Sequence, residues 1–151
     1  MRILIGTDGS DFSKYAVEKA CEFIRPHKAE VLCLSTYENP VTTAIDPAFT
    51  SNTYYQSLVE ALSVGAENNV KDAEKQIRTH FSPDEVPIRT EVLNGYADNL
   101  ILEKAKEWGA DLIVVGSHGR GFWGRLLGSV SNGVVHHAPC SVLVAKKPGL
   151  N

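Results

Sequence analysis

Two isolated glycines and a glycine–serine pair near the end of the chain have the types and spacing that suit phosphate binding. Gly116 and Gly119 follow the apolar run 112–115, and Gly128 and Ser129 begin a segment with helical character. A phosphate must come within hydrogen-bonding distance of backbone N–H groups, and a β-carbon would block that approach. A helix start adds unpaired N–H donors and a dipole that favours an anion. The Ser129 hydroxyl could cap that helix or donate to a phosphate oxygen.

Glycines at such positions also occur simply because a chain turns, and short glycine motifs match by chance. The surrounding pattern favours phosphate binding here, since a buried strand is predicted before the glycines and a helix after them. A second apolar run, 142–145, follows Pro139. The segment therefore predicts a βαβ unit of the kind found in parallel nucleotide-binding folds.

Predicted strands and helices alternate along the whole chain. The expected strands are Arg2–Thr7, Glu30–Tyr37, an alternating edge strand from Ile88 to Val92, Leu112–Val115 and Val142–Ala145. The expected helices are one that ends at Arg25-Pro26, one over Thr53–Phe81, one from an Asp98 N-cap to Gly109, and one that begins at Gly128. This alternation predicts an α/β fold, a doubly wound five-stranded parallel sheet with helices on both faces, in one domain over residues 1–151.

The longest predicted helix has an apolar stripe with steps of three and four residues. Its members are Leu58, Leu62, Ala66, Val70, Ala73 and Ile77, which we expect to face the core. The preceding segment, Glu38–Asn52, has no periodicity and contains two prolines. We interpret it as a surface loop or lid.

The composition is that of an ordinary globular protein. Of 151 residues, 43% are hydrophobic and 22% charged, and the net charge of −3 gives no reason to expect nucleic-acid or membrane partners. No apolar run approaches the ~20 residues of a membrane helix, and no signal peptide is predicted. Cys21, Cys33 and Cys140 are odd in number and far apart, so we interpret them as small apolar residues in a reducing cytoplasm.

Several polar residues are candidates for contact with a ligand. Asp8 follows the first strand, where open parallel sheets bind ligands, but helix capping or an Asx turn would explain it equally well. Arg120 and Arg125 could reach phosphates or could simply be solvated. His118 lies in the glycine loop, and no HExxH or nucleophile motif accompanies it. For His136 and His137, stabilisation of a helix C-terminus is the favoured interpretation.

Four segments together resemble the universal stress protein family, in its adenine-nucleotide-binding branch. They are residues 3–10, 110–119, 128–131 and 137–144. The motif of that branch has two glycines three apart, a nine-residue spacer and then Gly-Ser or Gly-Thr. Gly116, Gly119, Gly128 and Ser129 match it. The resemblance implies a Rossmann-like sheet with strand order 3-2-1-4-5.

The resemblance also implies a ligand and the residues that hold it. The ligand would be ATP or AMP, with Mg²⁺ as an optional companion ion, and Asp8 would contact the adenosine, with Gly6 and Thr7 beside it. Thr36 would hold adenine through its backbone, and Val115 would line the same pocket. The residues around the ribose and phosphates would be Gly116, Gly119, Gly128, Ser129 and Val130, to which we add Arg120 as a candidate because of its charge. A homodimer through the strand Val142–Ala145 is implied as well.

The chain departs from the family pattern in the length of its spacer. Residues 120–127 number eight rather than nine, which removes up to ~3.5 Å of reach or turns a helical segment by ~100°. We therefore expect a weakened hold on the terminal phosphates and less than a roughly tenfold preference for ATP over AMP.

Three functions compete at this point. The first is a cytoplasmic stress-response module that binds an adenine nucleotide for regulation or protection. The second is a slow ATP hydrolase or nucleotide-activating enzyme, against which stands the lack of a GxxxxGK[ST] or SGGxDS motif. The third is a two-component receiver, which would need an aspartate at the end of the third strand, where this chain has Asn94.

Overall fold

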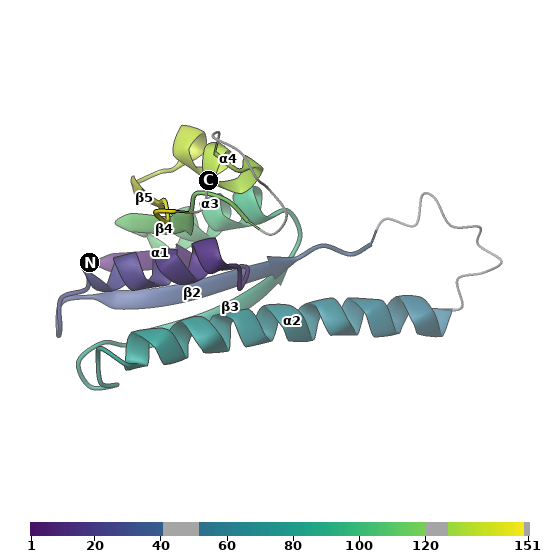
Figure 1. Ribbon diagram of the computed structural model, residues 1–151, viewed down its shortest axis with the longest axis horizontal. Helices are drawn as coiled ribbons and strands as arrows, with labels where there is room; N and C mark the ends of the chain where they lie inside the picture. Colours follow the sequence, from purple (N-terminus) through teal and green to yellow (C-terminus); the bar gives the residue numbers. More distant parts are fainter. Residues whose placement is uncertain (41–51, 120–126, 150–151) are drawn as a thin grey trace.

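The computed structural model describes residues 1–40, 52–119 and 127–149 (Figure 1). Within these residues five parallel strands form one sheet in the order β3-β2-β1-β4-β5, as expected. The strands are β1 (Arg2–Gly6), β2 (Glu30–Tyr37), β3 (Ile88–Asn94), β4 (Leu112–Gly116) and β5 (Ser141–Ala145). The helices are α1 (Asp11–Cys21), α2 (Asn52–Arg78), α3 (Ala97–Trp108) and α4 (Ser129–His137). The predicted doubly wound α/β fold is confirmed.

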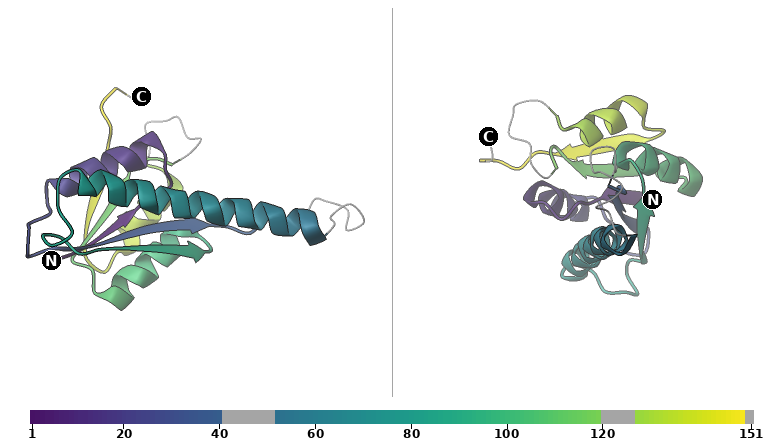
Figure 2. Two further views of the ribbon diagram at one scale, coloured as in Figure 1. Left: turned by 90° about the horizontal axis from the view of Figure 1, so that it is seen from below. Right: turned by 90° about the vertical axis from the view of Figure 1, so that its right-hand side faces the viewer.

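The helices cover both faces of the sheet, α1 and α2 on one and α3 and α4 on the other (Figure 2). Successive side chains of β1 point to opposite faces of the sheet, so β1 contributes to a separate core on each face. Ile3 and Ile5 pack with α1 and α2, whereas Leu4 packs in the second cluster with α3 and α4. All three side chains are fully buried. Because both faces are covered, the central strands are continuously apolar.

The strand order places a switch point between β1 and β4. The chain leaves β1 to form β2 on one side, and it later adds β4 on the other side of β1. The connections that follow β1 and β4 lead to α1 and α4 respectively. A crevice for ligands is expected outside the carboxyl ends of these two strands.

Helix α1 ends earlier than its sequence pattern predicts. The helix was expected to reach Arg25-Pro26, but it ends at Cys21. The amides of Glu22 and Phe23 donate to carbonyls only three residues back, at 3.2 and 3.0 Å, which tightens the last turn and ends the helix. Ile24, beyond the helix, still reaches the core and is 2% exposed.

Helix α3 was predicted correctly at one end and incorrectly at the other. Gly109 adopts the left-handed conformation that ends the helix, with φ 67°. Asp98 is not the N-cap, because the helix begins at Ala97 and the amide of Leu100 donates to the Tyr96 carbonyl at 3.1 Å. Asp98 instead lies against α4, where a β-carbon on Gly133 would come within 2.8 Å of its Oδ2 atom.

Helix α2 extends beyond the sheet that it covers (Figures 1 and 2). In its C-terminal half the predicted stripe is correct, since Ala66, Val70, Ala73 and Ile77 are all at most 3% exposed. Leu58 and Leu62, predicted in the same stripe, are 36% and 38% exposed. The stripe continues past the end of the surface that it was expected to contact. The predicted loop or lid Glu38–Asn52 falls mostly on residues 41–51, outside the described residues.

Candidate functional site

A cavity of about 460 Å³ lies at the carboxyl ends of β1, β2 and β4. Ten of the eleven predicted site residues line it, which are Gly6, Thr7, Asp8, Thr36, Val115, Gly116, Gly119, Gly128, Ser129 and Val130. The eleventh, Arg120, lies outside the described residues, as does Arg125. Predicted residues from four segments of the chain are thus brought to one place by the switch point of the sheet.

Sequence reasoning missed other residues of the same cavity wall, namely Ser13, Leu34, Ala97, Ile101 and Ser131. Leu34 could have been found, because it lies two residues before Thr36 on a strand and so points to the same face. Ile101 belongs to the predicted apolar stripe of its helix, but its approach to the cavity depends on Gly6. A β-carbon on Gly6 would lie 3.0 Å from the Cδ1 atom of Ile101.

The turn between β1 and α1 forms one wall of the cavity through hydrogen bonds of short side chains. Asp8 accepts a bond from the Ser10 amide at 3.0 Å, which is an Asx turn, and Ser10 is the residue that caps α1 by accepting from the Ser13 amide. The buried hydroxyl of Thr7 donates to the Ser13 hydroxyl at 3.2 Å. Asp8 therefore fixes the turn and lines the cavity at once, so its two predicted roles are compatible.

Gly119 lies directly beside the Asp8 carboxylate. A β-carbon on Gly119 would come within 2.9 Å of the Asp8 Oδ2 atom. The absence of a side chain at this glycine therefore allows the loop backbone to lie close to the carboxylate. Both residues line the cavity, where a ligand hydroxyl could approach them.

The start of α4 is joined to the glycine loop through the Ser117 carbonyl. This oxygen accepts from the Gly128 amide at 2.8 Å and from the Ser131 hydroxyl at 3.0 Å. The Gly128 amide is therefore not a free donor, contrary to the sequence analysis. Gly128 and Ser129 line the same cavity as Gly116 and Gly119, and the weakened hold on the terminal phosphates expected from the short spacer stays a prediction.

The N-terminus of α4 still presents donors to the cavity. Gly128, not Ser129, is the N-cap residue, and no side chain of the described structure caps the helix. The first backbone bond within the helix runs from the Asn132 amide to the Gly128 carbonyl at 2.9 Å. The amides of Ser129, Val130 and Ser131 precede it and have no partner within the helix. This arrangement suits an anion.

The histidines differ in their relation to the cavity. His118 lines it and is 8% exposed; its Nδ1 lies 3.1 Å from the Ser117 hydroxyl, and its ring packs at 5.2 Å from the Phe12 ring. His118 thus links the glycine loop to α1. His137 is exposed, and its Nδ1 lies 3.0 Å from the Gly133 carbonyl in the last turn of α4. That position fits the expected stabilisation of the helix C-terminus.

The cysteines are free thiols. Burial raises the pKa of Cys33 to about 12 and that of Cys21 to about 11. Cys33 is fully buried as predicted, whereas Cys21 and Cys140 are only partly buried. Among the described residues no three His, Cys, Asp or Glu side chains are grouped as a metal site. None of the described helices has the length and apolarity to cross a membrane.

The fold and the cavity define a doubly wound α/β protein whose candidate site lies at the switch point of its sheet. Residues 1–146 match the Universal stress protein family, and the chain belongs to that family. It is 34% identical over 148 residues to a universal stress protein of Methanocaldococcus jannaschii, covering 97% of this chain and 82% of that protein.

Solved structures of the family have the same fold. The universal stress protein UspA from Lactobacillus plantarum matches with a TM-score of 0.79 and 26% identity, over 96% of this chain and 97% of that one. An Arabidopsis thaliana universal stress protein solved with AMP bound matches at TM-score 0.63 and 19% identity, over 99% and 93%. A universal stress protein in complex with cAMP matches at 0.61 and 23%, over 96% and 95%. At these last two identities the likeness concerns the fold.

Proposed function

We propose that the cavity binds an adenine nucleotide and that the protein is a nucleotide-responsive module of a stress response. One observation supports this above the others. The uncapped N-terminus of α4, Gly119 and Asp8 line the same cavity. A set of anion donors and a carboxylate acceptor would thus face one ligand. The complexes of similar folds with AMP and cAMP agree with this choice of ligand.

The lining residues divide into two parts that match the two ends of a nucleotide. Leu34, Ile101 and Val115 provide apolar walls for the base, and the backbone of Thr36 lies at the end of the same strand as Leu34. Asp8 is placed to accept from ribose hydroxyls. The amides of Ser129 and Val130 would donate to phosphate oxygens, with Arg120 as a further phosphate contact. Mg²⁺, where ATP is the ligand, would be held chiefly by the phosphates.

The proposal is tested first on the protein as purified. Denaturation followed by mass spectrometry identifies any nucleotide that was retained. Calorimetric titration of nucleotide-free protein with AMP, cAMP, ATP and GTP then measures affinity, and we expect the adenine nucleotides to bind at least tenfold more tightly than GTP. No binding of any adenine nucleotide by folded protein would overturn the proposal. Phosphate release in the ATP samples separates a binding module from a slow hydrolase.

A matched pair of glycine variants tests the location of the site. Gly119→Ala adds a methyl group beside Asp8, inside the cavity, and should weaken adenine-nucleotide binding at least tenfold. Gly65→Ala adds the same group on α2, where a β-carbon meets nothing within 4 Å, and should leave binding unchanged. Equal affinity of the two variants would place the nucleotide elsewhere.

A homodimer through β5 is part of the proposal. β5 is at one edge of the sheet, as its predicted role requires. An edge strand leaves a row of backbone groups without strand partners, and antiparallel pairing with a second copy would satisfy them. Free thiols at all three cysteines support a reducing compartment, which we take to be the cytoplasm.

A further inference from the structure

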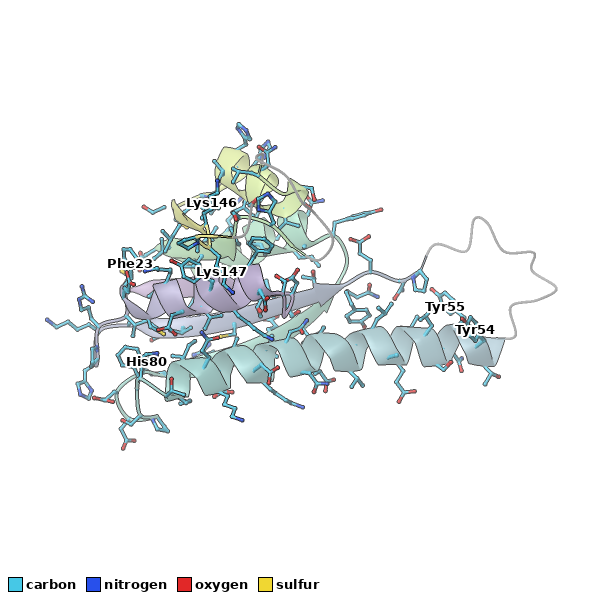
Figure 3. All side chains as sticks on the ribbon, viewed as in Figure 1. Phe23, Tyr54, Tyr55, His80, Lys146 and Lys147 are labelled. Carbon is cyan, nitrogen blue, oxygen red and sulfur yellow. The ribbon has the colours of Figure 1, made fainter. Side chains whose placement is uncertain are left out.

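The N-terminal half of α2 is unlike the rest of the protein surface. Residues 53–66 include one charged side chain, Glu60, whereas residues 67–78 include six. In the same half Tyr54, Leu58, Leu62 and Val64 are 61%, 36%, 38% and 46% exposed. Figure 3 shows Tyr54 and Tyr55 on the part of α2 that extends past the end of β2. A helix segment that exposes several large apolar side chains and has one charge normally lies against something.

The small residues of this half are arranged in one row. Ser57, Ala61 and Gly65 are four residues apart and therefore form a shallow groove along the helix. Leu58 and Leu62 form a ridge on one side of the groove, and Val64 lies on the other side. Helices pack by placing such a ridge of one helix into such a groove of another. The N-terminal half of α2 has both a ridge and a groove of this kind.

Within this row, Gly65 adds a conformational reason to expect a partner. A glycine within a helix is unfavourable relative to alanine, and a close approach of another backbone is a common reason for it. At Gly65 a β-carbon would meet nothing within 4 Å in this chain. The packing within the described chain therefore does not explain this glycine, whereas a second helix lying in the groove would.

We propose that the N-terminal half of α2 pairs with the same segment of a second copy of this chain, ridge into groove across a twofold axis. The surface is self-complementary, because ridge and groove occur on one segment and a twofold axis brings each to the other. The charge of this surface also favours a second copy of the chain over other partners. Residues 53–66 have no Lys or Arg, which an anionic membrane or a nucleic acid would require, and the one carboxylate flanks the groove.

The area of the contact predicts its strength. One pair of half-helices is small compared with the ~1,200–2,000 Å² of stable interfaces, so the pairing is reversible. It is also separate from the proposed β5 contact, because α2 covers the face near β2 and β3 while β5 is at the opposite edge of the sheet. With both contacts formed, dimers joined through β5 would associate further as concentration rises.

Sedimentation equilibrium of the full chain from ~1 to several hundred micromolar tests the proposal with two matched charge variants. Ala61→Lys places a cation in the groove, and Gln56→Lys places one on the opposite side of the same exposed helix segment. We expect wild type and Gln56→Lys to show the same concentration-dependent rise in mass. Ala61→Lys should weaken the association constant of that step at least tenfold.

A third variant separates the pairing from a loss of folding. Gly65→Ala should raise the melting temperature, because alanine favours the helix, and should weaken association at least threefold, because the methyl group fills the groove. Misfolding cannot produce this combination. The proposal is overturned if Ala61→Lys associates like wild type, if both lysine variants are equally impaired, or if wild type shows no step that Ala61→Lys removes. Co-sedimentation of wild type with vesicles of zwitterionic lipid, lost in Ala61→Lys, would assign the surface to a membrane instead.

Discussion

Gly116, the last residue of β4, lies against the backbone of Phe12 in α1. A β-carbon on Gly116 would come within 2.9 Å of the Phe12 carbonyl carbon and 3.0 Å of its oxygen. The glycine therefore allows a helix and a strand to approach each other directly beneath the cavity. Its location in a phosphate-binding motif suggested that the ligand requires this glycine, but the nearest constraint is internal packing. The proposed ligand and the packing of α1 would both place demands on this residue.

We expect Gly116→Ala to destabilise the protein, because the backbone of α1 must move to accept the methyl group. Overpacking of this kind costs about 1–3 kcal/mol in the free energy of unfolding. Urea denaturation measures it, with Gly65→Ala as the control, which should be stabilised by ~0.5–1 kcal/mol. Unchanged stability of Gly116→Ala would mean that α1 yields easily. Larger substitutions such as Gly116→Val are unsuitable for testing ligand binding, since a loss of affinity could follow from the loss of packing.

ATP should bind less than about tenfold more tightly than AMP, a difference below ~1.4 kcal/mol. The reason is that the Gly128 amide already donates to the Ser117 carbonyl, which leaves fewer donors for further phosphates. Titration of both nucleotides into nucleotide-free protein measures the ratio. A hundredfold preference for ATP would contradict the prediction.

Insertion of one leucine after Leu127 distinguishes two reasons for a small preference. If the eight-residue spacer limits the reach of the loop, the insertion should raise ATP affinity and leave AMP affinity unchanged. If the engagement of the Gly128 amide is the cause, both affinities should stay as they are. We expect both affinities to be unchanged, because the Gly128 amide already donates to the Ser117 carbonyl.

A proline at one of two adjacent residues of β5 should separate dimerisation from folding. Ala145 directs its carbonyl to β4, where it accepts from the Ser117 amide, so the backbone groups of Leu143 face β4 and those of Val144 face the free edge. Val144→Pro removes an outward amide and should give a folded monomer. Leu143→Pro removes an amide of the β4–β5 ladder and should lower the melting temperature instead. Light scattering and circular dichroism on both variants check this at a concentration below that at which α2 pairs, and a dimeric Val144→Pro under these conditions would exclude the β5 contact.

The contact between α1 and α2 should weaken in acid. A hydrogen bond from Gln76 holds the pKa of Glu18 below its usual 4.5, with a further contribution from His80, whose Nε2 atom lies 3.4 Å from the Glu18 carboxylate. Because the folded pKa is lowered, the stabilisation is complete above the unfolded value and is lost as pH falls through the folded one. The Glu18 side chain is 49% exposed, so the effect should stay below ~1 kcal/mol.

Denaturation of wild type and Gln76→Met at pH 6 and pH 3 measures this contribution. The stability difference between the two proteins should shrink at pH 3. Part of it should remain, because Gln76 also donates to the Lys14 carbonyl, a bond that does not titrate. In a Glu18→Gln background the difference should not depend on pH. A difference equally large at both pH values in wild-type background would contradict the assignment.

The sequence predicted the central strands well, because buried parallel strands are continuous apolar runs that a helix cannot imitate over so short a length. The strand order followed from the resemblance to the family and not from these runs. Gly109 was predicted correctly as a helix end, since few residues other than glycine adopt its positive φ. Asp98 was not, because an aspartate near a helix start is compatible with several positions in the first turn. Leu58 and Leu62 show a different limit. Periodicity identifies the apolar face of a helix and not the point at which the sheet beneath it ends.

The candidate site was predictable where one residue type has one plausible role. Glycines beside a strand end and a helix start indicated where the cavity would lie. The sequence could not show that the Gly128 amide is engaged by Ser117, nor that Gly116 meets Phe12, because both relations join segments that are distant along the chain or connected by a loop. Ile101 was missed for the same reason, since only the packing of α3 on β1 brings it to the cavity.

The hydrogen bonds to the Ser117 carbonyl affect which sequence changes the protein can tolerate during evolution. Its bonds from Gly128 and Ser131 fix the two ends of the connection between β4 and α4 next to each other. For a segment with fixed ends, doubling the length adds only about 0.6 kcal/mol of closure entropy. Residues can therefore be exchanged, inserted or deleted there while the helix start stays in place. Sequence changes in this connection can therefore alter the ligand specificity of the protein without a change in its fold.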